Sequence, residues 1–195
     1  MSIRVKICGI TRPEDARLAD KAGADAIGVV LFSDSPRSIP VEKAREIFRA
    51  AGPYIGRVCV THTVSVRELA LVLTLQPTAI QISHPHKLPE YRPYQVIRVI
   101  RTGDPIPGSA DAVIVDSSMG KGISYDHEYA KNIISMSKIP VILAGGLNPD
   151  NVREAAKLRP YAVDVASGVE SSTGIKDAGK VMAFVKNARK AHDEA

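Results

Sequence analysis

The sequence has few of the residues that mark several large protein classes. It contains two cysteines, no tryptophan and 5% aromatic residues. Cys8 and Cys59 have neither metal-ligand nor disulfide-framework spacing, which excludes a disulfide-rich secreted domain. No apolar run approaches the roughly 18 residues of a membrane span, and the first residues alternate with charges, unlike a signal peptide. We therefore expect a protein of the reducing cytoplasm that does not contact a membrane.

The charge of the chain is modestly positive, at +5 over 195 residues. Lysine and arginine are scattered without a basic run, and the low aromatic content argues against a nucleic-acid partner. A solvated surface explains most of this charge, although an anionic small molecule also fits it. The length suits one domain covering residues 1–195, large enough for a substantial core.

Short apolar segments alternate with helical or loop segments along the whole chain. The expected strands cover residues 3–8, 26–32, 56–60, 79–82, 95–100, 112–115, 140–143 and 162–165. The expected helices cover residues 13–22, 40–51, 65–75, 128–136 and 148–158, and a last helix starts at Asp177. Such alternation is typical of parallel strands joined by right-handed crossovers.

Eight such units predict an α/β fold of the closed (β/α)₈ type, a compact TIM barrel. The chain is shorter than the roughly 250 residues typical of that fold. Residues 85–93 and 102–110 are proline-rich and too short for full helices, so we expect shortened units after strands four and five. An open, doubly wound sheet is the alternative, but no GxGxxG motif follows any strand.

Cys8 is the first candidate for chemistry. It ends the first expected strand, Gly9 breaks that strand, and Thr11 and Pro13 signal the start of a helix with Thr11 as its cap. Ligands of parallel α/β folds bind at the carboxyl ends of the strands. Cys8 is therefore either a functional thiol or a buried cysteine that packs as a small hydrophobic residue.

Other strand ends carry further polar residues, namely Gln81, Asp116 and, in the loop after the second strand, Arg37. Asp116 is a candidate general acid with a raised pKa, or else a helix cap or ion-pair partner. The planar guanidinium of Arg37 suits a carboxylate, or else it is an exposed loop charge.

Two neighbouring turns are rich in glycine. Gly145 and Gly146 follow the seventh strand, with Asn148 as the expected cap of the next helix, and Ser167 and Gly168 follow the eighth. Glycine turns at these positions form the usual phosphate site of such barrels. The alternative is that the glycines serve only as tight turns.

Five segments together resemble the phosphoribosylanthranilate isomerase family, barrel enzymes of tryptophan synthesis. The opening motif is Lys-Ile-Cys-Gly-Ile-Thr at residues 6–11. Further segments follow in the family's order at residues 23–28, 35–37, 144–152 and 162–170. The resemblance therefore extends from the first expected strand to the eighth.

This resemblance implies an Amadori rearrangement of N-(5-phosphoribosyl)anthranilate, a phosphosugar. Cys8 then matches the family's general base, Asp116 its general acid, and Arg37 the arginine that holds the anthranilate carboxylate. The glycine turns match its phosphate site, and Gln81 matches its strand-four glutamine. The implied chemistry needs no metal and no organic cofactor. A thiol base requires a modestly lowered pKa to act at neutral pH.

The sequence also departs from the family pattern. His84 comes one place late after Gln81, His62 stands where the family commonly has asparagine, and the loop with Asp126 lacks a tryptophan. Roles for these three residues stay open, as does assembly as a monomer or a homodimer.

Three other functions compete with the isomerase. A pentose-phosphate epimerase would need paired carboxylates and metal-binding histidines at strand ends, and indole-glycerol-phosphate synthase would need a strand-end lysine acid. The expected strand-end residues include neither feature. A non-catalytic sensor of a phosphate ligand would bind it without Cys8.

Overall fold

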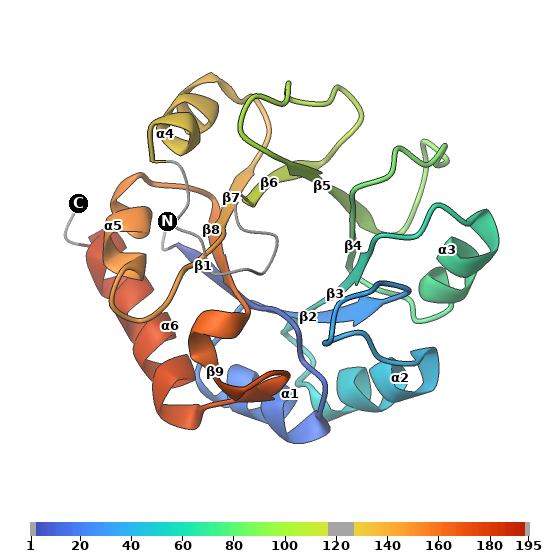
Figure 1. The fold of residues 1–195 in the computed structure, drawn as a ribbon, viewed down its shortest axis with the longest axis horizontal. Coiled ribbons are helices and arrows are strands. Elements are labelled where there is room, and N and C mark those ends of the chain that lie inside the picture. The colour runs from blue at the N-terminus through green and yellow to red at the C-terminus, as the bar shows by residue number, and fades with distance from the viewer. Residues whose placement is uncertain (1–2, 117–126, 194–195) are drawn as a thin grey trace.

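Eight parallel strands form a closed barrel in the computed structural model, which describes residues 3–116 and 127–193. Each strand pairs with the next along the chain, and β8 pairs with β1 to close the ring (Figure 1). The strands are β1 (Arg4–Ile7), β2 (Ala26–Leu31), β3 (Gly56–Thr61), β4 (Ala79–Ile82), β5 (Gln95–Ile100), β6 (Ala112–Asp116), β7 (Val141–Ala144) and β8 (Ala162–Val165). The predicted TIM barrel is confirmed.

Helices surround the ring on its outer side (Figure 1). They are α1 (Pro13–Lys21), α2 (Val41–Ala50), α3 (Val66–Leu73), α4 (His127–Met136), α5 (Val152–Lys157) and α6 (Ala178–Asp193). Residues 83–94 and 101–111 contain no helix, so the shortened units predicted after β4 and β5 are confirmed. Among the described helices, none has the length and apolar character needed to cross a membrane.

Two apolar clusters hold the barrel together. The larger lies between the strands and the helices and includes fully buried Ile7, Leu31 and Phe184. The smaller fills the inside of the ring, with Val30 and Ile114 among its members. Because successive side chains of a strand point to opposite faces, the strands β2 to β8 contribute to both clusters. Burial of each large side chain favours folding by about 1.5–3 kcal/mol.

Two predicted helix caps are wrong. Thr11 does not cap α1, because its hydroxyl donates to the carbonyl of Gly174 at 2.5 Å, and Arg12 occupies the cap position without a side-chain bond. Asn148 lies too early to cap α5, whose cap position is Asn151. The Asn148 side chain instead accepts hydrogen bonds from the amides of Asp150 and Asn151, which stabilises a turn before the helix.

A small element after β8 has no counterpart in the sequence prediction. A single 3₁₀ turn, η1 (Ser167–Val169), leads into the antiparallel pair β9 (Glu170–Ser172) and β10 (Ile175–Lys176). The register places Lys176 opposite Glu170. These strands were missed because they are shorter than any periodic pattern that a sequence can reveal.

Candidate active site

One pocket at the carboxyl ends of the strands collects most of the predicted site residues. Its lining includes Cys8, Arg37, Gln81, Asp116, Gly145, Gly146 and Ser167. These residues come from both ends and the middle of the chain, and the closed ring brings them together. Gly168, the remaining predicted residue, does not line this pocket.

Cys8 lies one residue beyond β1, not within the strand as predicted. Its amide donates to the carbonyl of Val165 at 2.7 Å, so the last contact between β1 and β8 fixes the position of the thiol. The residue is only 8% exposed, yet it lines the pocket. A Cβ atom on Gly28 would lie 2.8 Å from its sulfur, so the glycine on neighbouring β2 leaves the space that the thiol fills.

Gln81 and Asp164 line the floor of the pocket, and Lys6 contacts both from below. These three buried polar side chains are called the floor cluster. The ammonium of Lys6 donates to Asp164 at 2.9 Å and to Gln81 at 3.3 Å. The register pairs Lys6 with Asp164, so both side chains enter the barrel at one level. Gln81, predicted as a substrate contact, therefore also accepts from a lysine of the protein.

Lys6 also acts on Cys8, because the two residues lie on the same face of the chain two positions apart. Burial raises the pKa of the Cys8 thiol, the Lys6 charge lowers it, and the Asp164 charge raises it again; the net pKa lies above the ordinary value. The protein alone therefore does not supply the modestly lowered pKa that a thiol base requires, because burial outweighs the nearby ammonium.

Cys59 offers a contrast within the same barrel. It is fully buried in the outer cluster, and burial alone raises its pKa to about 12. Both cysteines are free thiols. Charged groups therefore distinguish Cys8 from a cysteine that only packs.

Asp116 is the last residue of β6, where it pairs with Ala144 of β7. Ile114 and Ala112, two and four positions earlier, belong to the cluster inside the ring. The alternation of the strand therefore directs the Asp116 carboxylate to the mouth of the same pocket. Burial is the largest cause that raises the pKa of Asp164, and Lys6 lowers this pKa. The charge of Asp116 also raises it, so the mouth of the pocket is linked electrostatically to its floor.

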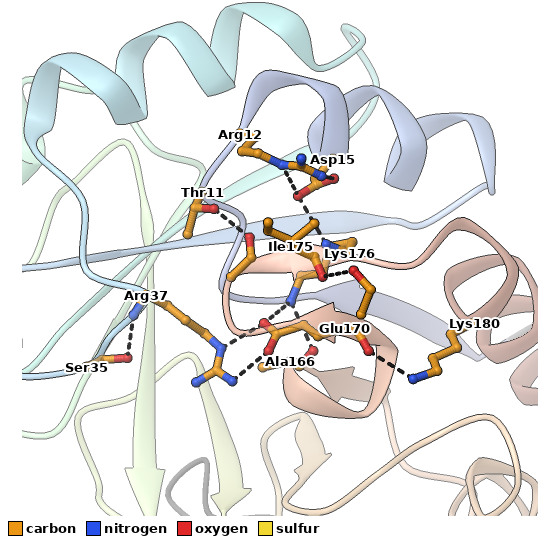
Figure 2. Close-up of polar contacts among 12 residues, drawn as sticks. Thr11, Arg12, Asp15, Ser35, Arg37, Ala166, Glu170, Ile175, Lys176 and Lys180 are labelled. Carbon is orange, nitrogen blue, oxygen red and sulfur yellow. Dashed lines mark hydrogen bonds and ion pairs between the residues drawn. The ribbon is translucent and has the colours of Figure 1, made fainter.

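Arg37 lines the pocket, and behind it lie Glu170 and Lys176, which form ion pairs with each other and with Arg37 through Glu170. We call these three residues the wall cluster. The Nε and Nη2 atoms of Arg37 donate to the two carboxylate oxygens of Glu170 at 2.8 and 2.7 Å (Figure 2). The Arg37 side chain is only 12% exposed, so the alternative of an exposed loop charge is wrong. Gly9 has a φ of +69°, and a Cβ there would lie 2.6 Å from the Arg37 Cδ.

Lys176 completes the wall cluster. Its ammonium donates to Glu170 at 2.9 Å and to the carbonyl of Ala166 at 3.0 Å, and its side chain is fully buried. Burial acts to raise the pKa of Glu170, but the hydrogen bonds from Arg37 and Lys176 outweigh burial and keep that pKa below its ordinary value.

The glycine turns differ in what their glycines do. Gly145 and Gly146 have φ values of +98° and +63°, a conformation that favours glycine, and both line the pocket. Gly168 is needed for packing, since a Cβ atom there would lie 1.9 Å from the Leu147 carbonyl oxygen. The turn after β8 thus packs on the turn after β7, and Ser167 is its residue that lines the pocket.

The sequence departs from the family pattern at or near His62, His84 and Asp126, and these residues lie in different surroundings. His62 lines the pocket and shares a 2.8 Å hydrogen bond with Ser33. His84 lies edge-on to His86, with ring centroids 4.7 Å apart. Asp126 lies outside the described residues. Within residues 3–116 and 127–193, no three His, Cys, Asp or Glu side chains are placed to hold a metal ion.

Sequence reasoning missed Lys6, Asp164, Glu170 and Lys176. One signal was available for Lys6, because it shares a strand face with Cys8 and must enter the barrel if the thiol does. Asp164 lies in an apolar strand, where a charge requires a partner. Glu170 and Lys176 offered no signal, because their meeting depends on the short β9–β10 pair.

Comparison with known proteins identifies relatives of the whole chain. The model of the family described as N-(5'phosphoribosyl)anthranilate (PRA) isomerase matches residues 5–187. An N-(5'-phosphoribosyl)anthranilate isomerase of Methanoregula boonei is 56% identical over 97% of this chain and 98% of its own. The crystal structure of the Thermus thermophilus enzyme superposes with a TM-score of 0.84 at 39% identity, covering 95% of this chain and 98% of that one.

A further solved structure holds a ligand. It is a phosphoribosyl anthranilate isomerase in complex with reduced 1-(o-carboxyphenylamino)-1-deoxyribulose 5-phosphate. It superposes with a TM-score of 0.76 at 31% identity, covering 96% of this chain and 99% of that one.

Proposed function

Since this chain belongs to the N-(5'-phosphoribosyl)anthranilate isomerase family of tryptophan biosynthesis, we propose that Cys8 and Asp116 catalyse its reaction and that Arg37 binds the substrate carboxylate. One observation carries the proposal. Cys8, Asp116 and Arg37, from three separate parts of the chain, line one pocket together with the turns after β7 and β8.

The substrate is an N-(5-phosphoribosyl)anthranilate, and its two anionic ends suit two parts of the pocket. The positive-φ turn at Gly145 and Gly146 and the adjoining Ser167 hold the phosphate through backbone amides. Gly168 lets the turn after β8 pack closely on the turn after β7. Arg37 holds the carboxylate at the other side. The sugar then spans the floor between Cys8 and Asp116.

The first step opens the ribose ring. Asp116, as a carboxylic acid, donates its proton to the ring oxygen while the bond between that oxygen and C1 breaks, and the nitrogen lone pair forms a protonated imine. The positively charged imine at C1 withdraws electrons from the neighbouring C2, and this makes the proton on C2 acidic. No metal or organic cofactor takes part in this proposal.

The second step removes the C2 proton. The Cys8 thiolate takes it, and the electrons of the C–H bond form the C1–C2 double bond of an enolamine, which tautomerises to the ketone. Burial favours the protonated thiol. Lys6 and the imine, both positively charged, favour its thiolate form once the sugar ring has opened, and the thiol proton is released to water before the thiolate takes the C2 proton.

A biosynthetic role and two free thiols support a cytoplasmic location for this reaction. The main alternative, a non-catalytic phosphate sensor on the same scaffold, makes the opposite prediction for the thiol.

The test is a fluorescence assay with freshly made phosphoribosylanthranilate, comparing the wild type with Cys8→Ala. We expect loss of substrate fluorescence with the wild type alone, faster than the spontaneous breakdown. Turnover by Cys8→Ala at the wild-type rate would remove the thiol from the mechanism. Ligand binding without turnover by the wild type would favour the sensor.

A further inference from the structure

The residue beside Arg37 is an anion, although Arg37 is proposed to bind another anion. Glu170 lies within the wall cluster at 6% side-chain exposure, and it accepts one hydrogen bond from Arg37 on each of its oxygens (Figure 2). Two explanations are possible. Glu170 either takes the place on Arg37 where the substrate carboxylate would bind, or it orients Arg37 for that carboxylate.

The charge of the wall cluster distinguishes these explanations. Arg37 and Lys176 bring two positive charges, and Glu170 brings one negative charge. The cluster therefore retains one positive charge when Glu170 is in place. Binding of one substrate carboxylate makes the cluster neutral. Displacement of Glu170 from Arg37 would instead remove two of the three side-chain hydrogen bonds that this buried carboxylate accepts and leave it with Lys176 alone, at high cost.

The atoms of the guanidinium that Glu170 uses support the second explanation. Glu170 takes the edge formed by Nε and Nη2. Among the described residues, no acceptor contacts Nη1, and Arg37 lines the pocket. The second edge, formed by Nη1 and the outer N–H of Nη2, is therefore available for a second bidentate carboxylate.

Glu170 has further partners besides Arg37. Besides the ion pair to Lys176, the backbone carbonyl of Glu170 accepts from Lys180 at 2.9 Å. The amide of Lys176 donates to the buried carboxylate of Asp15, which Arg12 also contacts (Figure 2). The β9–β10 pair is thus attached to the first turn of α1. This helix follows directly on the β1–α1 connection that carries Cys8.

We infer that Glu170 is a positioning residue, which Lys176 holds in place and which orients Arg37 so that its second edge receives the substrate carboxylate. This inference rests on the proposed function and deepens it. It makes the β9–β10 pair a determinant of specificity for substrates with a carboxylate beside the anilino nitrogen.

The decisive variant is Glu170→Gln, because it keeps the size of the side chain but removes its charge. If Glu170 only competed with the substrate, the variant would gain positive charge and bind the anionic substrate more tightly. Under our inference Arg37 loses its orientation, so KM rises by about tenfold or more while kcat changes by less than about threefold. An unchanged or lower KM would overturn the inference.

Ligand binding locates the effect at the carboxylate. The probes are reduced 1-(o-carboxyphenylamino)-1-deoxyribulose 5-phosphate and the matching phenylamino compound without the carboxylate, measured by calorimetry. We expect Glu170→Gln to weaken binding of the first by about tenfold or more and to leave the second within about twofold. Equal weakening of both would indicate a general loss of structure and would contradict a positioning role.

Two further variants separate position from charge. Glu170→Asp keeps the charge but withdraws it from Arg37, and we expect it to raise KM as Glu170→Gln does. In an Arg37→Ala background, Glu170→Gln should have no further effect on KM, because the two residues act as one unit. Additive effects would show that Glu170 acts independently of Arg37.

A crystal of the wild type with the carboxylate-bearing probe keeps the inference testable if the variants do not fold. We expect Arg37 to contact Glu170 through Nε and the ligand through Nη1. A guanidinium that leaves Glu170 for the ligand would overturn the inference. Failure of the proposed function is separate: it would appear as a wild type without turnover, whereas failure of this inference leaves turnover intact.

Discussion

The floor cluster and the wall cluster are both buried groups of charges, but their balance differs. In the floor cluster, one cation and one anion meet at 2.9 Å, and the amide of Gln81 adds a neutral acceptor. In the wall cluster, two cations share one carboxylate. The first group is complete by itself, whereas the second retains a positive charge beside the pocket.

This difference separates two tasks. A balanced pair can stay buried without a ligand, and it sets the electrostatic conditions for the thiol above it. An unbalanced group attracts an anion from solution. Changes to the floor cluster should therefore affect stability and proton transfer, and changes to the wall cluster should affect binding.

The largest expected effect comes from breaking the floor pair. Lys6→Met leaves Asp164 as an unpaired buried charge, so we expect the free energy of unfolding to fall by about 3–5 kcal/mol. Urea unfolding measures it. The double variant Lys6→Met/Asp164→Leu should recover most of the loss, since neither residue then carries a charge.

The matched control for this prediction is an ion pair on the surface. Arg17 and Glu14 on α1 are more than half exposed, and their contact is 3.2 Å. Arg17→Ala should change the free energy of unfolding by less than about 0.5 kcal/mol. A Lys6→Met variant as stable as Arg17→Ala would show that the floor pair is open to water.

The next largest effect should be on steady-state kinetics, where a variant of the proposed acid and a variant of the proposed binding residue should differ. Asp116→Asn removes the proposed acid, so we expect kcat to fall by about 100-fold or more with little change in KM. Arg37→Ala should chiefly raise KM, because it removes a binding contact. Steady-state kinetics with phosphoribosylanthranilate measures both. The reverse pattern, in which Asp116→Asn affects only KM, would contradict the assignment of tasks.

The smallest effect concerns the pH dependence of the thiol. The pKa of Cys8 is raised, so its alkylation by iodoacetamide should become faster with increasing pH until the pH exceeds that pKa. Lys6 lowers this pKa and Asp164 raises it. Asp164→Asn should therefore shift the rate profile to lower pH, and Lys6→Met should shift it to higher pH.

Mass spectrometry separates this reaction from that of Cys59. Cys59 is fully buried with a pKa of about 12, so it should stay unlabelled in the folded protein and serve as an internal reference. Shifts of the same sign in both Cys8 profiles would show that the variants act through structure and not through charge.

Much of the fold could be predicted because its signals are local. Apolar runs such as Ala26–Leu31, turns with glycine and the proline-rich stretches without helices follow from neighbouring residues. The cap at Ser65 is equally local, and its side chain accepts from the amide of Glu68. The predicted cap at Thr11 failed because its hydroxyl binds the carbonyl of Gly174, a distant partner that local sequence does not specify. The predicted cap at Asn148 failed because its side chain binds the amides of Asp150 and Asn151, in a turn that precedes the helix.

The site was predictable only in part, for a similar reason. Strand ends can be read from the sequence, and in a barrel they converge, so Cys8, Gln81 and Asp116 could be placed in one pocket. The partners of Arg37 and the raised pKa of Cys8 depend on contacts between distant residues. Burial and charge balance come from the closed ring, which no short segment specifies.

The closure of β1 on β8 has a consequence for the growing chain on the ribosome. Asp164 follows Lys6 by 158 positions, and synthesis adds about 5–20 residues per second, so roughly 8–30 s separate the two charges. Throughout that interval the lysine beside the thiol lacks its partner Asp164. The ring and the reactive centre are therefore completed by one event late in translation, and a nascent chain that lacks β8 has no competent pocket.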